Sequence, residues 1–151
     1  MYIYHYDLVR ESKAVNYDAR RTINSPNLVK ELAFEIFEAN NYNPEKEHFI
    51  ILMFNTKNKV VGYHLVSMGG LNSSLVHPRE VFRPAILHGA CSIVLIHNHP
   101  SGDITPSNED IKLTLKLEKA GKIIGIEVLD HIIIGTDEEK NSLSLKKEFY
   151  F

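Results

Sequence analysis

At 151 residues the chain is long enough to bury one hydrophobic core without disulfides or structural metals, and this length favours a single domain. With 44% hydrophobic and 24% charged residues it is ordinary for a soluble protein, and no apolar run approaches the roughly 20 residues of a membrane helix. One cysteine, Cys91, excludes an internal disulfide and a multi-cysteine zinc site, and a net charge of −2 gives no global sign of nucleic-acid binding. The N-terminus has no signal-like apolar core, so we expect a cytoplasmic protein.

The first part of the chain predicts an arm, a helix and a hairpin. Residues 1–24 begin with tyrosines at alternate positions, as in an edge strand or an arm on the main domain. Ser25 and Pro26 are typical of a helix N-cap and first helical residue, and apolar residues then recur at helical spacing up to about residue 39. Residues 48–55 and 60–67 are strand-prone runs around a polar turn, which predicts a β-hairpin.

A second helix is predicted after a short strand candidate over residues 71–76. Pro78 begins this helix, which we expect to run to about residue 90. Cys91 directly precedes the next strand and is expected to be a small core residue. The inward face of the helix is predicted to comprise Val81, Phe82, Ala85 and Ile86.

The remaining elements predict a central strand, a third helix and a return to the sheet. The run SIVLI, residues 92–96, is apolar on both faces, which is typical of a central buried strand. A third helix is predicted over residues 106–121, with Gly121 as its C-terminal cap. Residues 123–130 and 131–137 then indicate two closing strands.

This order of elements predicts an α/β (α+β) fold with a single mixed β-sheet flanked by helices. We divide the chain into an N-terminal arm (1–24), a main domain (25–136) and a C-terminal tail of the same domain (137–151). Loops at the carboxyl end of a buried strand open into a crevice, so that end of residues 92–96 is where we expect a site.

The stretch HNHPSGDITPSNED, residues 97–110, follows that strand and carries ligand-like residues. His97 and His99 lie two apart and point to the same side if the strand continues, and Asp110 in the next helix is the natural third ligand. Imidazole suits zinc, whose catalytic sites use three protein ligands plus an exchangeable water. The alternative is a plain capping box, because Ser107 and Asp110 have the spacing of an N-cap and its third helical residue.

The same stretch matches His-x-His-x7-Ser-x2-Asp, the signature of the MPN+ (JAMM) metalloprotease domain, and as a whole it resembles the RadC branch of that superfamily. The segments HPREVF (77–82), DHIIIG (130–135) and EHFIILMFNTKNKVVG (47–62) resemble RadC proteins too. The resemblance covers about residues 25–136 and implies the MPN/JAB cytidine-deaminase-like sandwich.

The resemblance implies a role for each residue. His97, His99 and Asp110 correspond to ligands of one Zn2+, and Ser107 would hold its hydroxyl toward the bound water or the developing oxyanion. Glu47 occupies the place of the superfamily's general base. The residue pattern alone does not choose Glu47 over Glu45, Glu80 or Glu109. Glu80 is the runner-up, although a position early in a helix also suits interaction with the helix dipole.

Three further residues lie near these positions, and two of them have two interpretations each. Asp130 and His131 either support the metal site from behind or only form hydrogen bonds at a strand edge. Asn98 should face away from the metal and satisfy backbone groups.

The function implied by the resemblance is a zinc-dependent metallopeptidase or isopeptidase-like hydrolase, in which a zinc-bound water attacks an amide carbonyl of a peptide or isopeptide-linked protein. The alternatives are a non-catalytic RadC-like binding module associated with DNA or DNA-repair proteins, and a metal-dependent nuclease; the charge balance does not support DNA contact. We expect no membrane partner, and the arm or the aromatic residues 149–151 offer a route to a homo-oligomer.

Overall fold

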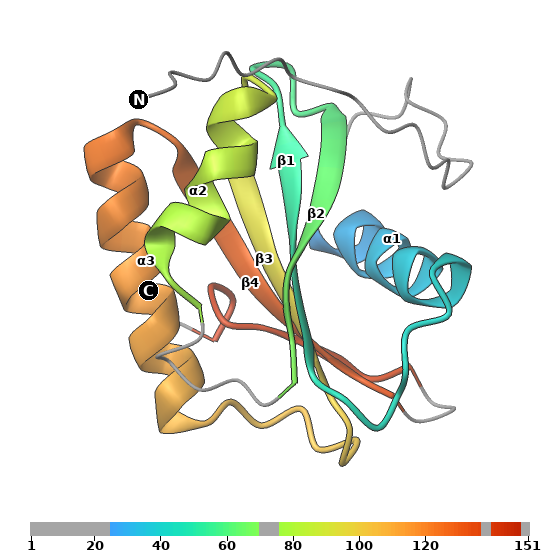
Figure 1. Ribbon diagram of the computed structural model, residues 1–151. Helices are drawn as coiled ribbons and strands as arrows, with labels where there is room; N and C mark the ends of the chain where they lie inside the picture. Colours follow the sequence, from blue (N-terminus) through green and yellow to red (C-terminus); the bar gives the residue numbers. More distant parts are fainter. Residues whose placement is uncertain (1–24, 70–75, 137–139, 149–151) are drawn as a thin grey trace, which may run out of the picture.

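The computed structural model describes residues 25–69, 76–136 and 140–148, and the structural statements below concern these residues (Figure 1). Of the predictions above, the arm (1–24), most of the strand candidate at 71–76 and the aromatic end (149–151) lie outside them. No described helix is both long and apolar enough to cross a membrane. The described elements, in chain order, are α1 (Pro26–Ala39), β1 (His48–Phe54), β2 (Val60–Met68), α2 (Pro78–Leu87), β3 (Ser92–His99), α3 (Asn108–Ile124), β4 (Glu127–Gly135) and β5 (Ser142–Ser144).

One mixed sheet organises these elements. Its strand order is β2-β1-β3-β4-β5, with β3 and β4 parallel and every other neighbouring pair antiparallel. Helix α1 covers one face, and α2 and α3 cover the other (Figure 1). The predicted fold class, a single mixed sheet flanked by helices, is confirmed. Strand β3 has neighbours on both sides, as its continuous apolar run predicts.

Two hydrophobic cores lie on opposite faces of the sheet, and successive residues of β3 alternate between them. Ile93 and Leu95 pack with α2 and α3, whereas Val94 and Ile96 pack with α1. By this alternation the next residue, His97, points to the side of α3. The fully buried cores hold β3 rigidly, so side chains at its carboxyl end have well-defined positions.

Strand β4 contains a bulge that reverses its alternation. Ile93 pairs with Val128, but the next residue of β3, Val94, pairs with Asp130, so Leu129 is an extra residue. Leu129 and Asp130 consequently both lie on the α1 side, and His131 turns toward α3. Strict alternation from Val128 would instead place Asp130 toward α3 and His131 toward α1.

The C-terminal half of α3 corrects one prediction. The helix ends at Gly125, which adopts a left-handed φ of 83°, and not at Gly121. Gly121 lies inside the helix, at a point where only glycine fits. A Cβ there would collide with the backbone oxygen of Ile126 and approach the Phe82 ring to 3.2 Å. This glycine therefore serves close packing between α3, α2 and the start of β4.

Four other predictions are wrong in detail. The two closing strands are a single strand, β4, and a short strand, β5, lies in the expected C-terminal tail. Helix α2 ends at Leu87, so Ile86 on its last turn is 56% exposed instead of facing the core. Cys91 lies between α2 and β3, where it is exposed; it is not a core residue.

Candidate metal centre

The three predicted ligands converge at the carboxyl end of β3. His97 and His99 point to the α3 side of the strand, and Asp110 faces them from the first turn of α3. One ligand atom from each residue lies within 4.8 Å of the other two. The Nε2 atoms of His97 and His99 are 2.8 Å apart. Asp110 places Oδ1 3.4 Å from the first of these nitrogens and Oδ2 3.5 Å from the second.

The capping box at the start of α3 is present together with this cluster. The Ser107 hydroxyl accepts from the Asp110 backbone N–H at 3.1 Å, and Oδ2 of Asp110 accepts from the Ser107 N–H at 2.7 Å. The hydroxyl also donates to Asp110 Oδ2 at 2.7 Å. Capping and metal ligation are thus compatible, because the cap holds the carboxylate in place facing the histidines. The hydroxyl proton of Ser107 is directed at Asp110, and its predicted role toward an oxyanion stays a prediction.

Each histidine has a polar partner on its second nitrogen. Nδ1 of His99 lies 2.6 Å from the carbonyl of Asp103, so it donates to that oxygen. Nδ1 of His97 lies 2.7 Å from Nε2 of His131, a fully buried residue of β4. These contacts leave both Nε2 atoms facing each other and Asp110, which is the arrangement expected of paired imidazole ligands.

The electrostatics of the cluster separate the two histidines. Burial holds the pKa of His97 well below its usual value, and the neighbouring His131 adds to this. In contrast, the contact with the Asp110 carboxylate raises the pKa of His99 against the opposing effect of burial. Burial also opposes ionisation of Asp110, but its contact with His99, the charge of His97 and its bonds to Ser107 outweigh that and lower its pKa. A carboxylate and a neutral imidazole are therefore available as ligands.

The chemistry of this donor set fits a metal ion. Two imidazole nitrogens and a carboxylate converge here; His97 and Asp110 are buried, and His99 is partly exposed. Atoms that all offer electron pairs repel one another at such distances unless a cation lies between them. Two histidines and one carboxylate suit zinc, with a fourth position left for water or substrate.

Glu47, the predicted base, lies beside this cluster. Strand β1 pairs antiparallel with β3, with Phe49 opposite His97, and Glu47 directly precedes β1 at the same end of the sheet. Phe49 packs on the α3 side, and continuing the alternation one residue beyond the start of β1 puts Glu47 on that side too. Its negative charge contributes to the raised pKa of His99. An open hollow of about 370 Å³ is lined by Glu45, Lys46, Glu47, Met68, Gly69 and Pro100, the residue after His99; the three ligands are not part of its lining.

Asn98 holds the backbone on either side of Glu47. Its Oδ1 accepts from the His48 N–H at 2.7 Å, and its Nδ2 donates to the Lys46 carbonyl at 2.9 Å. The prediction that Asn98 faces away from the metal and satisfies backbone groups is consistent with these two bonds. Glu47 lies between the two backbone groups that Asn98 holds. Asn98, which lies between His97 and His99 in the sequence, therefore links the candidate base to the candidate ligands.

The competing base, Glu80, is not brought to the cluster. It lies in the first turn of α2, where it forms exposed ion pairs with Arg79 at 3.2 Å and Arg83 at 3.1 Å. This arrangement matches the alternative interpretation, an acid near a helix N-terminus.

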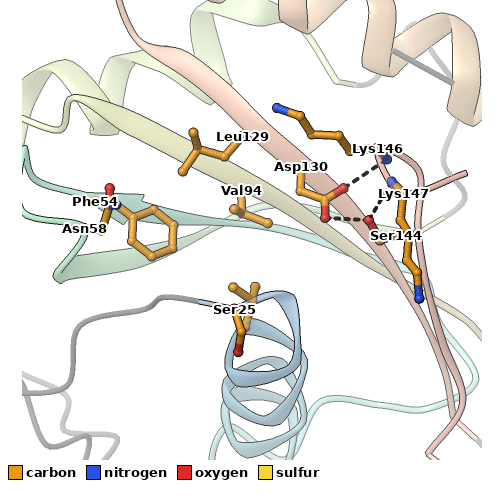
Figure 2. A pocket seen from close by; sticks show the side chains of 10 residues that line it. Ser25, Phe54, Asn58, Val94, Leu129, Asp130, Ser144, Lys146 and Lys147 are labelled. Atoms are coloured by element: carbon orange, nitrogen blue, oxygen red, sulfur yellow. Dashed lines mark hydrogen bonds between the residues drawn. The ribbon is translucent and has the colours of Figure 1, made fainter. Parts of the chain in front are cut away.

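Asp130 and His131 serve opposite faces of β4. The carboxylate of Asp130 accepts from the backbone N–H of His131 at 2.7 Å. It also accepts from the backbone N–H of Lys146 at 3.2 Å and from the hydroxyl of Ser144 at 2.6 Å (Figure 2). It thereby ties the C-terminal segment to β4. His131, in contrast, contacts the metal cluster through His97. Of the two interpretations given for this pair, support of the site applies directly to His131 and through the backbone to Asp130.

Two residues at the site were not identified in the sequence. Thr114 lies one turn after Asp110, donates to its carbonyl at 2.6 Å, and is 2.6 Å from Nδ1 of His131. The carbonyl of Asp103 is the partner of His99. A threonine inside a helix and a backbone carbonyl in a loop have no distinguishing sequence signal, although the i+4 spacing from Asp110 was available for Thr114.

The fold and the donor set together define a class: an α+β domain with a mixed sheet and a His-x-His-x10-Asp cluster at the end of its central strand. The family model described as "RadC-like JAB domain" matches residues 23–149. The chain belongs to the RadC-like JAB domain family.

Curated relatives named UPF0758 protein agree with this assignment. The one from Caldanaerobacter subterraneus subsp. tengcongensis is 54% identical over 70% of this chain and 44% of its own length. Those from Desulfitobacterium hafniense and a Geobacillus species are 47% and 44% identical over 93% and 95% of this chain, and over 59% and 61% of their own lengths. The chain thus spans about half the length of the curated relatives it matches.

Proposed function

We propose that this domain is a zinc-dependent hydrolase of amide bonds, a metallopeptidase or isopeptidase of the JAMM type. The observation that carries the proposal is the convergence of His97, His99 and Asp110 within 4.8 Å of one another, at the end of a buried strand. The position of Glu47 on the same side of the sheet supports it, because amide hydrolysis needs a group that moves protons beside the metal.

The roles of the protein groups follow from their chemistry. A bound zinc ion would acidify a water molecule and polarise the carbonyl of the substrate. Glu47 accepts the proton of the attacking water and passes it to the leaving nitrogen. The Ser107 hydroxyl, which donates to Asp110 Oδ2 at 2.7 Å, would turn its proton to the developing oxyanion, and a transition-state donor of this kind contributes on the order of 3 kcal/mol.

The proposed substrate is a peptide or a protein carrying an isopeptide bond. The hollow is lined by Glu47, the proposed base, and by Pro100, which follows the proposed ligand His99, and it is open to solvent, so an extended chain can enter it from outside. An open hollow suits a macromolecular substrate better than a small ligand, which a pocket usually encloses.

The first test is the metal content of the purified protein, measured by elemental mass spectrometry after incubation with zinc chloride and dialysis. We expect about one zinc ion per chain in the wild type and almost none in the double variant His97→Ala/His99→Ala. Equal metal content in the two proteins, or none in either, would contradict the metal site.

The second test compares hydrolysis by Glu47→Gln and Glu45→Gln. The probes are a tryptic peptide library, with new amino termini counted by mass spectrometry, and a peptide joined through a lysine side chain. We expect the Glu47 variant to lose activity by a factor of about 100 or more while it keeps zinc, and the Glu45 variant to retain activity. Full activity of the zinc-loaded Glu47 variant would refute the role of this residue.

The competing functions give different results in the same experiments. Zinc-dependent cleavage of plasmid or single-stranded DNA, with no cleavage of either peptide probe, would indicate a nuclease. A DNA affinity that falls steeply with salt, without hydrolysis of any probe, would indicate a binding module associated with DNA.

A further inference from the structure

A chain of three short hydrogen bonds runs from the first predicted ligand to the backbone of the third. Nδ1 of His97 lies 2.7 Å from Nε2 of His131, whose Nδ1 lies 2.6 Å from the hydroxyl oxygen of Thr114. That hydroxyl lies 2.6 Å from the carbonyl oxygen of Asp110. All four residues are buried, so water does not compete for these bonds.

We propose that His131 and Thr114 are positioning residues that fix the tautomer and orientation of His97, so that its Nε2 lone pair is presented to the metal. This inference rests on the metal site of the proposed function and deepens it. It concerns residues of β4 and α3 that contribute no ligand atom themselves.

The donors and acceptors of the chain allow one consistent arrangement of protons. The Asp110 carbonyl is only an acceptor, so the single hydroxyl proton of Thr114 is donated to it. The hydroxyl oxygen must then accept from Nδ1–H of His131. A neutral imidazole has one N–H, so Nε2 of His131 accepts, and the donor is Nδ1–H of His97. Nε2 of His97 is left without a proton on the side of His99 and Asp110.

The end of this hydrogen-bond chain at Asp110 is fixed by the start of α3. Asp110 supplies the terminal carbonyl and is itself held by the capping box with Ser107, so the reference point for the proton order is a rigid helix start. Thr114 follows four residues later on the same helix face, which brings its hydroxyl to that carbonyl. The chain therefore connects the ligand on β3 with the ligand on α3 through β4.

Packing prevents the histidine rings from leaving this chain. Phe49 of β1 lies 6.2 Å from the His97 ring in a stacked arrangement and 5.6 Å from the His131 ring, edge to face. Behind His131, its backbone N–H is held by Asp130, which Ser144 and Lys146 hold in turn (Figure 2). The β4 bulge turns His131 toward α3, so three independent features converge on one ring position.

Removal of the Thr114 hydroxyl should change which ring nitrogens of His131 and His97 carry protons. In Thr114→Val, Nδ1 of His131 has no acceptor, so the ring gains by placing its proton on Nε2 instead. That proton would then be donated to Nδ1 of His97, whose own proton would move to Nε2, where it blocks metal binding. A threonine that only filled space would be replaced by valine without this effect.

The test measures zinc affinity and histidine tautomers in the 151-residue protein. The probe is zinc chloride in competition with a chromophoric chelator, and we expect Thr114→Val and His131→Phe to weaken zinc binding by about 10- to 100-fold. Thr114→Ser keeps the hydroxyl and should bind like the wild type. Thr136→Val is a matched control. The Thr136 hydroxyl lies 3.4 and 3.3 Å from the carbonyls of His99 and Pro100 and does not belong to the hydrogen-bond series that runs from His97 to Asp110.

The tautomers are read from nitrogen-15 chemical shifts of the histidine rings in the zinc-free protein. We expect His97 and His131 to carry their protons on Nδ1 in the wild type and in Thr114→Ser, and to lose that preference in Thr114→Val. Nε2-protonated rings in the wild type, or equal zinc affinity of Thr114→Val and wild type, would overturn the inference while leaving the metal site intact. A wild type that binds no zinc would overturn the proposed metal site, and this inference with it.

Discussion

Replacement of Asn98 by alanine should destabilise the protein more than the same replacement of an asparagine that water can reach. The side chain is fully buried between β1 and β3 and bonds the His48 N–H at 2.7 Å and the Lys46 carbonyl at 2.9 Å. Alanine leaves the buried His48 N–H without its partner, whereas the Lys46 carbonyl keeps its contact with Nδ1 of His48 at 2.8 Å. A buried unsatisfied polar group costs about 1–3 kcal/mol, so we expect a loss of this size in the free energy of unfolding.

Urea unfolding of the zinc-free protein measures this loss. Since m values of small proteins are roughly 1–3 kcal/mol per molar, the midpoint should fall by on the order of 1 M at unchanged m. Asn55→Ala is the matched control. Asn55 also accepts two backbone bonds, from Lys57 at 2.9 Å and Lys59 at 3.1 Å, but within the β1–β2 turn, where water can replace them. We expect it to cost under about 1 kcal/mol.

The same variant connects stability with the site. Its effect on zinc affinity should be small, because neither bond of Asn98 reaches a ligand atom. The backbone of Glu47, in contrast, loses the two hydrogen bonds that hold it on either side. A midpoint for Asn98→Ala no lower than that of Asn55→Ala would refute the reasoning, since burial is the only difference on which the larger value depends.

Three further predictions follow from other parts of the structure. Gly121→Ala should lower the free energy of unfolding by about 2 kcal/mol in urea melts, because its Cβ would collide with the backbone oxygen of Ile126; a stabilised variant would contradict that packing. Zinc at a hundred times its dissociation constant should stabilise the wild type by about 2.7 kcal/mol in thermal melts and leave His97→Ala/His99→Ala unchanged, and equal shifts would rule out this site. Burial lowers the pKa of His131 from 6.5 to about 4. Between these two pH values the unfolded chain binds more protons than the folded one, so stability falls as the pH drops from 6.5 to about 4. This contribution, up to about 3 kcal/mol, should be missing from zinc-free His131→Phe, and parallel pH curves for the two proteins would disprove it.

The elements that the sequence predicts correctly are those whose signals are local. Helix α1 begins after the Ser25 cap and ends at Ala39, as its helical spacing of apolar residues predicts. The central position of β3 follows from a run that is apolar on both faces. The convergence of His97, His99 and Asp110 also has a local origin, because a strand end and the next helix start are separated by one short loop.

The features that the sequence did not predict depend on contacts between distant segments. Gly121 resembles a helix cap, and only the closeness of Ile126 and Phe82 explains why it lies inside α3. Cys91 is exposed because α2 ends early, and propensity alone did not indicate this end. The partner of His97 could not be assigned from the Asp130–His131 dipeptide, because the side on which each residue points depends on one extra residue in β4.

The bulge at Leu129 makes the length of β4 as important as its composition. Even-numbered residues point to opposite faces of the sheet before and after it: Val128 packs toward α3, whereas Ile132 and Ile134 pack toward α1. Deletion of Leu129 alone would restore simple alternation and exchange the two faces of everything on one side of it. We expect such a deletion to cost more stability than any single substitution within β4, in a urea melt of the two kinds of variant, and a mild deletion would show that the strand can shift its register. In evolutionary terms, β4 should therefore accept exchanges of similar side chains but reject insertions and deletions.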